Sequence, residues 1–202
     1  MAAGPDTQLW PVYVISLLMI VGAIIDGWKL KVPHWLTFSM ILSGWLYWGT
    51  DGWSALGTSI AGAFAAGALL IIPYAIGGMG AGDVKMYAGF GAWMVPFPWF
   101  GYEHLFNAFA VSVILGSAIA MAMISWKGSV YVNLENIRDI VNDWKTSSSV
   151  GEIFDKAKKR KPTLQLLPYG IPLTIGSLAY ILYILPSTLS PLAVAIGSGS
   201  MP

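Results

Sequence analysis

Long apolar stretches separated by short charged connections dominate the pattern of the chain. Charged residues are absent from 7–25, 52–82, 86–102 and 162–202. Because a membrane-spanning helix needs about 20 mostly apolar residues, this pattern predicts an all-α polytopic membrane protein. The six transmembrane helices that we expect lie at about 9–25, 35–50, 55–76, 84–100, 105–126 and 168–186.

A polar segment at 128–161 interrupts this pattern, because it holds more than half of the Asp, Glu, Lys and Arg residues. Its apolar side chains recur three or four positions apart, which predicts an amphipathic helix with one apolar stripe: Val130, Leu134, Ile137, Val141 and Trp144. A second, shorter stripe at 150–157 precedes the basic run Lys158–Lys161. We expect two amphipathic helices on the cytoplasmic membrane surface, with the basic run near anionic headgroups. A small solvated cap folded on itself is the alternative.

The chain therefore divides into three parts. Residues 1–127 hold the first five spans, residues 128–161 form the cytoplasmic amphipathic and basic segment, and residues 162–202 hold the last span and a C-terminal tail. We expect the first span to remain in the mature protein, because no basic segment precedes it and no small-residue cleavage site follows it.

The positive charges fall on one side of the expected membrane. With six spans, alternate connections face opposite sides, and all 11 Lys and Arg residues lie in or beside the first, third and fifth connections. Asp6, Asp51 and Glu103 occupy the other side without a cation. Because Lys and Arg accumulate on the cytoplasmic side, we expect a multi-pass protein of the cytoplasmic (inner) membrane with both termini outside the cytoplasm.

The composition agrees with a membrane protein and excludes several function classes. Hydrophobic residues make up 56% and charged residues 10%, against roughly 25% charged residues in an average soluble domain. A net charge of +1 does not favour a nucleic-acid partner. The absence of cysteine excludes disulfides, iron–sulfur clusters, Cys-ligated zinc and thiol catalysis.

The two histidines, His34 and His104, offer little for metal binding. Each lies at the edge of an expected span, where an interfacial side chain is the simpler interpretation. The His-Glu-x-x-His motif of zinc proteases and the Gly-x-Ser-x-Gly motif of serine hydrolases are both absent. We therefore expect no metal ion and no cofactor.

Glycines are concentrated at 77–82, just before the fourth span. Asp83 stands where a phosphate-binding loop needs Lys, and the dinucleotide-binding pattern Gly-x-Gly-x-x-Gly does not fit. What remains is Gly80-Ala81-Gly82-Asp83 at the cytoplasmic end of a span. We expect the glycines to adopt unusual backbone angles and to let a substrate chain approach closely. Asp83 is a candidate functional residue, because an acidic side chain in a membrane span costs free energy.

Asp26 is the second candidate, since it directly follows the uncharged part of the first span. The first span runs toward the cytoplasm and the fourth begins there, so Asp26 and Asp83 are expected at the same depth. If their helices are neighbours, the two carboxylates can share one proton, as in aspartic proteases. One carboxylate then acts as general base on water, while its protonated partner polarises the scissile carbonyl. The alternative for Asp26 is an interfacial charge paired with Lys29 or Lys31.

Lys85 follows Asp83 by two residues, which corresponds to about 200° around a helix. The two side chains should therefore not share a face. Lys85 either holds a carbonyl or carboxylate of a substrate or only follows the orientation rule for positive charges, and the sequence favours the second interpretation narrowly.

The third span contains small residues that repeat four positions apart. Such spacing lets helix backbones approach closely in lipid, so we expect these positions to serve packing. The residues concerned are Gly57, Ala61 and Ala65, with Gly62 and Ala66 one step on.

Three segments, in order and over nearly the whole chain, carry a family resemblance. Asp26-Gly-Trp-Lys-Leu-Lys-Val-Pro-His-Trp-Leu-Thr combines an Asp, basic residues and a hydrophobic–Pro segment that opens the second span. Gly80-Ala81-Gly82-Asp83-Val84-Lys85 follows the pattern Gly-x-Gly-Asp-x-Lys, and Leu167–Pro172 is similar to a Pro-Tyr-Gly segment that opens the last span. Together they resemble the type IV prepilin peptidases, specifically the short form of tight-adherence pilus systems. The departure is His34, where that family usually has Asn.

The resemblance implies a six-helix aspartyl endopeptidase that removes the short hydrophilic leader from prepilins on the cytoplasmic side of the membrane. Asp26 and Asp83 become the catalytic aspartates, Gly80 and Gly82 shape the loop of the second one, and Lys85 is the candidate for positioning the substrate. The implied partners are a prepilin and the membrane lipids, without nucleic acid. The sequence leaves the oligomeric state open.

Longer relatives of this family carry a Cys-rich cytoplasmic insert and also N-methylate the cleaved pilin. This chain has no cysteine and no such insert after the first span, so we expect no methyltransferase activity. The segment 128–161 is longer than the resemblance implies, and its role stays open.

Two other classes of function remain possible for the same residues. A small ion-coupled transporter or channel could use Asp26 and Asp83, although neither lies at the middle of a span and no repeat relates the two halves of the chain. A non-catalytic membrane scaffold would use neither. Presenilin-type proteases share Gly-x-Gly-Asp, but they have more spans and their first Asp follows Tyr, whereas Ile25 precedes Asp26 here.

Overall fold

The protein is a bundle of α-helices. The computed structural model describes residues 9–29, 31–75, 79–127 and 169–197, and all regular elements in these ranges are helical. They are α1 (Trp10–Lys29), α2 (His34–Gly49), α3 (Trp53–Ala75), α4 (Ala81–Met94), α5 (Gly101–Lys127) and α8 (Gly170–Gly197). Each of the six spans expected from the sequence corresponds to one of these helices, so the all-α fold is confirmed. The predicted amphipathic helices and basic run at 128–161 lie outside the described residues.

The helices differ in length and apolar character, the two properties that decide whether a helix can cross a membrane. Within the described ranges, three helical stretches are long and apolar enough to do so, namely Trp10–Lys29, Trp53–Ala75 and Gly101–Ile119, and Gly170–Leu185 is a shorter apolar stretch. These properties agree with an integral membrane protein. The short helix α4 has 14 residues and is therefore about 21 Å long, against about 30 Å of hydrocarbon in a bilayer.

Two expected spans have the wrong boundaries. The fourth was expected at 84–100, but α4 begins at Ala81 and ends at Met94, and turns occupy 95–100. Pro96 and Pro98 lie in these turns and lack the N–H that a continuing helix needs. The last span was expected to end at 186, but α8 continues through Pro186 and Pro191 to Gly197.

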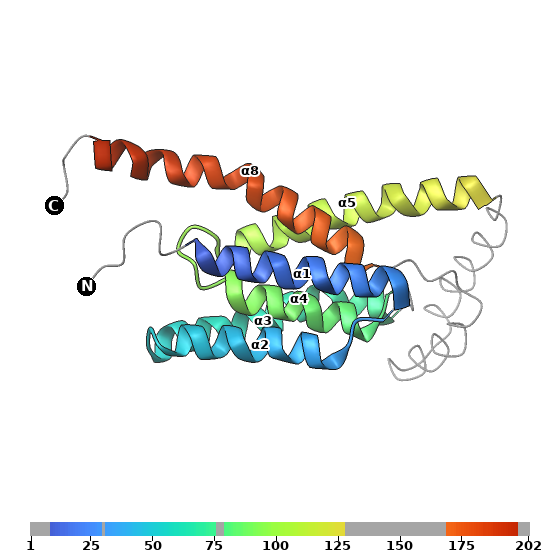
Figure 1. Ribbon diagram of the computed structural model, residues 1–202, viewed down its shortest axis with the longest axis horizontal. Coiled ribbons are helices and arrows are strands. Elements are labelled where there is room, and N and C mark those ends of the chain that lie inside the picture. Colours follow the sequence, from blue (N-terminus) through green and yellow to red (C-terminus); the bar gives the residue numbers. More distant parts are fainter. Residues whose placement is uncertain (1–8, 30, 76–78, 128–168, 198–202) are drawn as a thin grey trace.

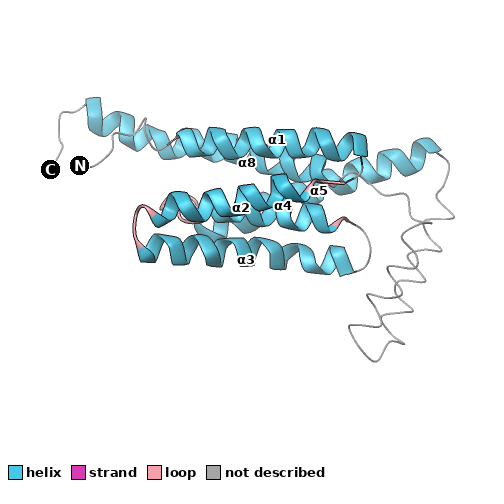
Figure 2. Cartoon of the chain, turned by 60° about the horizontal axis from the view of Figure 1, so that its bottom comes forward, coloured by secondary structure: helices cyan, strands magenta, loops and turns pink. Residues whose placement is uncertain are grey.

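Helix α4 forms the centre of the bundle, between α1 and α3 in both views (Figures 1 and 2). Its side chains are buried without interruption from Gly89 to Met94. Tryptophan hydrogen bonds fix its C-terminal half to α2: Trp93 Nε1 donates to the Met40 carbonyl at 2.9 Å, and Trp48 Nε1 donates to the Trp93 carbonyl at 3.0 Å. Since most of its surface meets other helices, α4 is held by protein contacts on nearly all sides.

Small residues bring α3 and α4 into close backbone contact. A Cβ atom built on Gly62 would lie 2.6 Å from the Gly91 carbonyl oxygen, so only glycine fits there. The small-residue stripe predicted for this span therefore packs against α4 at Gly62 and Ala66, which are both buried. Gly57 and Ala61 are exposed instead, so the packing interpretation was wrong for these two positions.

The candidate functional residues Asp26 and Asp83 lie at one end of the bundle. Helices α1 and α3 end there, α2, α4 and α8 begin there, and α5 continues beyond it (Figure 1). The exposed side chains of Lys29 and Lys31 belong to this end, because they terminate α1 and follow it. The alternation of helix directions thus brings the end of α1, the start of α4 and the start of α8 to a common level.

Candidate active site

Asp26 lies on the buried side of α1. The buried positions of this helix include Ile15, Met19 and Gly22, and continuing the same spacing of three and four residues reaches Asp26. Its side chain is only 3% exposed, one turn before the helix ends at Lys29. An interfacial charge paired with lysine would lie on the outside of the helix, so the burial favours the functional interpretation over this alternative.

The first residue of α8 holds the Asp26 carboxylate. The Gly170 backbone N–H donates a hydrogen bond to Asp26 Oδ2 at 2.9 Å, across 144 positions of sequence. A Cβ atom at Gly170 would lie 2.9 Å from Asp26 Oδ2 and 3.1 Å from Asp26 Cβ, so a side chain there would displace the carboxylate. The N–H groups of a first helical turn have no partner within their own helix, which leaves this one available to Asp26.

Asp83 is the third residue of α4 and is 4% exposed. The Gly80 N–H donates to Asp83 Oδ2 at 3.0 Å, and this bond closes the start of the helix. An acidic side chain in the first turn also interacts favourably with the positive end of the helix dipole. The Gly-x-Gly-Asp segment thus fixes the position of its own carboxylate through a local hydrogen bond.

The two aspartates lie at the same level of two contacting helices. Gly22 on α1 faces Met86 on α4, where a Cβ atom on Gly22 would be 2.7 Å from the Met86 sulfur. Asp26 follows Gly22 by four residues and Asp83 precedes Met86 by three, so each carboxylate is about one turn from this contact and within about 40–60° of its face. The helices run in opposite directions, and both steps therefore lead toward the same end of the bundle (Figure 1).

The motif glycines pack closely at the start of α4. Gly80 has φ −84°, a backbone angle that any residue adopts, so the predicted unusual angles are not found there. A Cβ atom on Gly82 would lie 3.0 Å from both the Cβ and the carbonyl oxygen of Val32. Gly82 therefore allows the start of α4 to pack against the connection between α1 and α2. Sequence reasoning missed Val32, which lies between Lys31 and Pro33 and is buried only through its packing against α4.

Lys85 turns toward α2. Its Nζ atom lies 4.7 Å from the centre of the Phe38 ring, where a cation interacts favourably with the aromatic face. This position agrees with the helical spacing, which separates the faces of Lys85 and Asp83. The described contacts of Lys85 therefore connect it to α2 and give no support to a role in positioning a substrate.

The two histidines lie at opposite ends of the bundle. His34 is the exposed first residue of α2, and His104 on α5 has its Nδ1 atom 2.6 Å from the Tyr180 hydroxyl on α8. Asn107 Nδ2 donates to the same hydroxyl at 3.1 Å. In the part of the chain that the structure describes, no group of three or more His, Cys, Asp or Glu side chains could hold a metal ion.

Gly170 is the site residue whose role sequence reasoning did not assign. The Pro-Tyr-Gly resemblance marked its segment, but no local pattern connects the segment to Asp26. The resulting arrangement consists of two buried carboxylates on adjacent helices, each holding a backbone N–H through Oδ2. Such a pair has the components for general acid–base hydrolysis of a peptide.

Comparisons with known proteins show the family of the chain. The sequence profile of the type IV leader peptidase family matches residues 13–125. A curated relative, the prepilin leader peptidase/N-methyltransferase of Pectobacterium carotovorum subsp. carotovorum, is 28% identical over 139 residues. That alignment covers 63% of this chain and 47% of the relative, so the chain spans about half of the relative's length. No solved structure matches the chain. Because the family profile covers more than half of the chain and includes both aspartates, the chain belongs to the type IV leader peptidase family.

Proposed function

We propose that this chain is a membrane-embedded aspartic endopeptidase that removes the leader peptide from type IV prepilins or prepilin-like proteins. The observation that carries the proposal is the placement of Asp26 and Asp83, both buried, at one level of two contacting helices. Burying carboxylates in an apolar bundle is unfavourable unless they are hydrogen-bonded, and it is unusual without a function. Membership of the family supports the same substrate class.

The hydrolysis needs only the two carboxylates and water. One carboxylate removes a proton from water as the water oxygen attacks the scissile carbonyl carbon. The partner is protonated, and it donates a hydrogen bond to the carbonyl oxygen, on which negative charge develops. Collapse of the tetrahedral intermediate breaks the C–N bond, and the proton taken from water passes to the leaving amine. The products are a leader carboxylate and a mature pilin with a new N-terminus.

The charge distribution supports a cytoplasmic active site. Lys29 and Lys31 lie at the same end of the bundle as Asp26 and Asp83. Because Lys and Arg mark the cytoplasmic side of membrane proteins, this end faces the cytoplasm in the proposed topology. The polar leader of a prepilin then meets the carboxylates at the membrane surface, while its apolar helix stays in lipid.

Exchange of each aspartate for asparagine tests the peptidase mechanism. Wild type, Asp26→Asn and Asp83→Asn are co-expressed with a panel of prepilins, and leader removal is measured by mass spectrometry. Both variants should cleave at least about 100-fold more slowly, since each removes a proton-transferring group. Asp51→Asn is the matched control, because Asp51 is exposed in the connection between α2 and α3 and should keep wild-type cleavage. Wild-type rates in either test variant would contradict the mechanism.

An ion-coupled transporter that uses the same carboxylates makes a different prediction. Its Asp→Asn variants would lose ion flux across liposomes, and the wild type would leave every prepilin intact. Both aspartates lie within one turn of a helix end, away from the middle of the helices where coupling ions usually bind. This position favours the peptidase.

We propose leader cleavage without methyl transfer. The name of the Pectobacterium relative includes an N-methyltransferase activity, but the chain covers only 47% of that protein. The chain also lacks the cysteines of the insert found in longer family members. The mass of the mature pilin tests this directly, because methylation replaces a hydrogen of the new N-terminus with a methyl group and so adds the mass of one CH2.

A further inference from the structure

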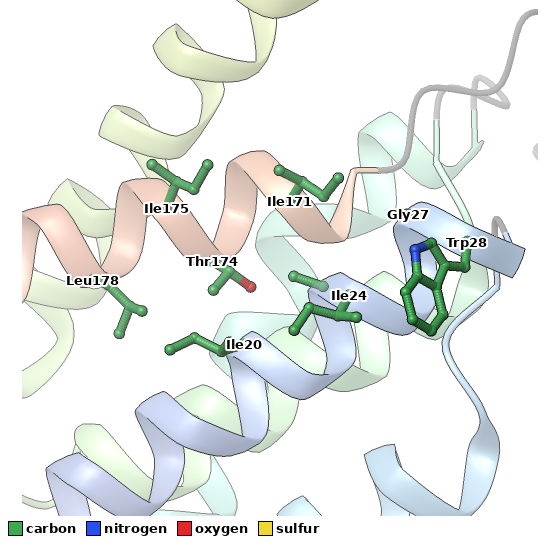
Figure 3. Close-up of a pocket in the computed structure, with 9 residues that line it drawn as sticks. Ile20, Ile24, Gly27, Trp28, Ile171, Thr174, Ile175 and Leu178 are labelled. Carbon is green, nitrogen blue, oxygen red and sulfur yellow. The ribbon is translucent and has the colours of Figure 1, made fainter.

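An apolar groove of about 510 Å³ runs along the outside of the bundle between α1 and α8. Residues from both helices line it: Ile20, Ala23, Ile24, Gly27, Trp28, Ile171, Thr174, Ile175 and Leu178. In Figure 3, Ile20 and Ile24 on α1 lie across from Thr174 and Leu178 on α8. The lining carries no charged group, and its one hydroxyl, that of Thr174, already donates to the Met19 carbonyl at 3.2 Å.

One end of the groove adjoins the proposed active site. Gly27 follows Asp26 directly, and Ile171 follows Gly170 directly, so the hydrogen bond between Asp26 and Gly170 joins the two walls at this end. The walls are close here, because a Cβ atom on Gly27 would lie 3.3 Å from Ile171 Cδ1. From this end the groove continues along α1 toward the middle of the bundle.

The dimensions and chemistry of the groove fit an apolar helix. Its lining extends along α1 from Ile20 to Trp28, which corresponds to about 12 Å or roughly two helical turns. The exposed Gly27 leaves room for close approach, which is how helices associate in lipid without a hydrophobic driving force. Trp28 is 84% exposed beside the end near Asp26, at the level where an aromatic side chain favours the membrane interface.

We propose that this α1–α8 groove binds the first two turns of the apolar helix of a prepilin and delivers the leader junction to Asp26. The inference rests on the peptidase function proposed above and adds a docking surface to it. Depth in the groove then sets which peptide bond reaches the carboxylates. A second apolar groove, of about 300 Å³, is lined by residues of α2, α3 and α4, none of which is adjacent in sequence to Asp26, Asp83 or Gly170, and so provides an internal control.

Filling each groove with tryptophan tests the docking surface. Ile20→Trp fills the α1–α8 groove six residues before Asp26, and Leu42→Trp fills the second groove. The two positions are matched, since Ile20 is 41% and Leu42 is 51% exposed. With a prepilin that the wild type cleaves, Ile20→Trp should lower kcat/KM roughly tenfold, mainly by raising KM, and Leu42→Trp should change it less than about twofold. Equal effects of the two substitutions would overturn the proposal.

Photocrosslinking gives a second measurement that does not depend on activity. A photoreactive phenylalanine is placed at Ile20, Ile24 or Leu42 in the Asp83→Asn background, together with the same prepilin. The first two positions should capture the prepilin helix, and the adduct from Ile20 should lie about four residues deeper in that helix than the adduct from Ile24. Adducts with lipid alone, with a second copy of the chain, or equally from Leu42 would overturn the proposal.

The two proposals fail in different ways. If the wild type cleaves no prepilin, the peptidase function fails and the docking surface fails with it. If the wild type cleaves a prepilin, but Ile20 and Ile24 give no adduct with its apolar helix, only the docking surface is wrong.

Discussion

Gly170→Ala is the substitution that most directly tests how the bundle positions the carboxylate of Asp26, for which we propose a catalytic role. The added Cβ atom would lie 2.9 Å from Asp26 Oδ2 and 3.1 Å from Asp26 Cβ. These distances are shorter than van der Waals contact, so one of the two groups must move. Either the Asp26 carboxylate rotates away or the start of α8 retreats. In both cases the 2.9 Å hydrogen bond from the Gly170 N–H to Asp26 is lost.

The size of the effect follows from the strength of that bond. A hydrogen bond to a charged group contributes about 1.5–3 kcal/mol, and about 1.4 kcal/mol corresponds to a tenfold change in rate. We therefore expect kcat/KM for prepilin cleavage to fall about 10- to 100-fold. Because Gly170 contacts the carboxylate and not the apolar groove, the loss should appear mainly in kcat. Leader removal followed by mass spectrometry over a range of prepilin concentrations separates the two parameters.

Two glycine variants serve as controls for this prediction. Gly176→Ala also adds a methyl group to α8, but its Cβ atom would press on Ser112 of α5, away from Asp26. Gly176→Ala should lower the unfolding temperature in detergent. The protein that stays folded should keep the kcat of the wild type, in contrast to Gly170→Ala. Gly57→Ala meets no atom within 4 Å and should change neither property. Wild-type kcat/KM in Gly170→Ala, or an equal loss of kcat in Gly176→Ala, would refute the positioning role.

Further expected outcomes concern the bundle and the reaction product. Gly62→Ala should destabilise the protein by about 1–3 kcal/mol, since its Cβ atom would lie 2.6 Å from the Gly91 carbonyl oxygen. Thermal unfolding measures this, with Gly57→Ala as the control. Equal stability of the two variants would contradict the close backbone contact between α3 and α4. Trp93→Phe removes the Nε1 donor to the Met40 carbonyl and should cost about 1 kcal/mol of stability while the folded fraction keeps its cleavage rate. A cleaved pilin should carry an unmethylated N-terminus, and a mass increase of one CH2 in purified components supplied with a methyl donor would show the reverse.

The hydrophobic pattern was sufficient to predict the helices, because apolar length is a local property of the sequence. Its error at the end of α4 has a local cause as well, because the helix ends before Pro96 rather than at 100, whereas α8 continues through Pro186 and Pro191 to Gly197. The predicted small-residue contact in α3 was correct for Gly62 and wrong for Gly57, since the spacing of small residues does not fix which side of the helix faces a neighbour.

The candidate site could be predicted in part. Burial of Asp26 and Asp83 and their common level agree with the expectation from span alternation, because charge and helix direction are readable along the chain. The bond from Gly170 to Asp26 joins residues 144 positions apart and depends on how α8 packs against α1, which no local pattern encodes. The α1–α8 groove was inaccessible to sequence reasoning for the same reason.

The central position of α4 has a consequence for the environment of the enzyme. Asp83 belongs to a helix enclosed by its neighbours, whereas Asp26 belongs to α1, which exposes side chains such as Tyr13 and Leu17 along one flank. A bilayer of different thickness tilts a lipid-facing helix at a cost of only fractions of a kcal/mol per Å of mismatch, while an enclosed helix stays in place. We therefore expect the alignment of Asp26 with Asp83 to change with acyl-chain length, which prepilin cleavage in liposomes of different thickness would measure.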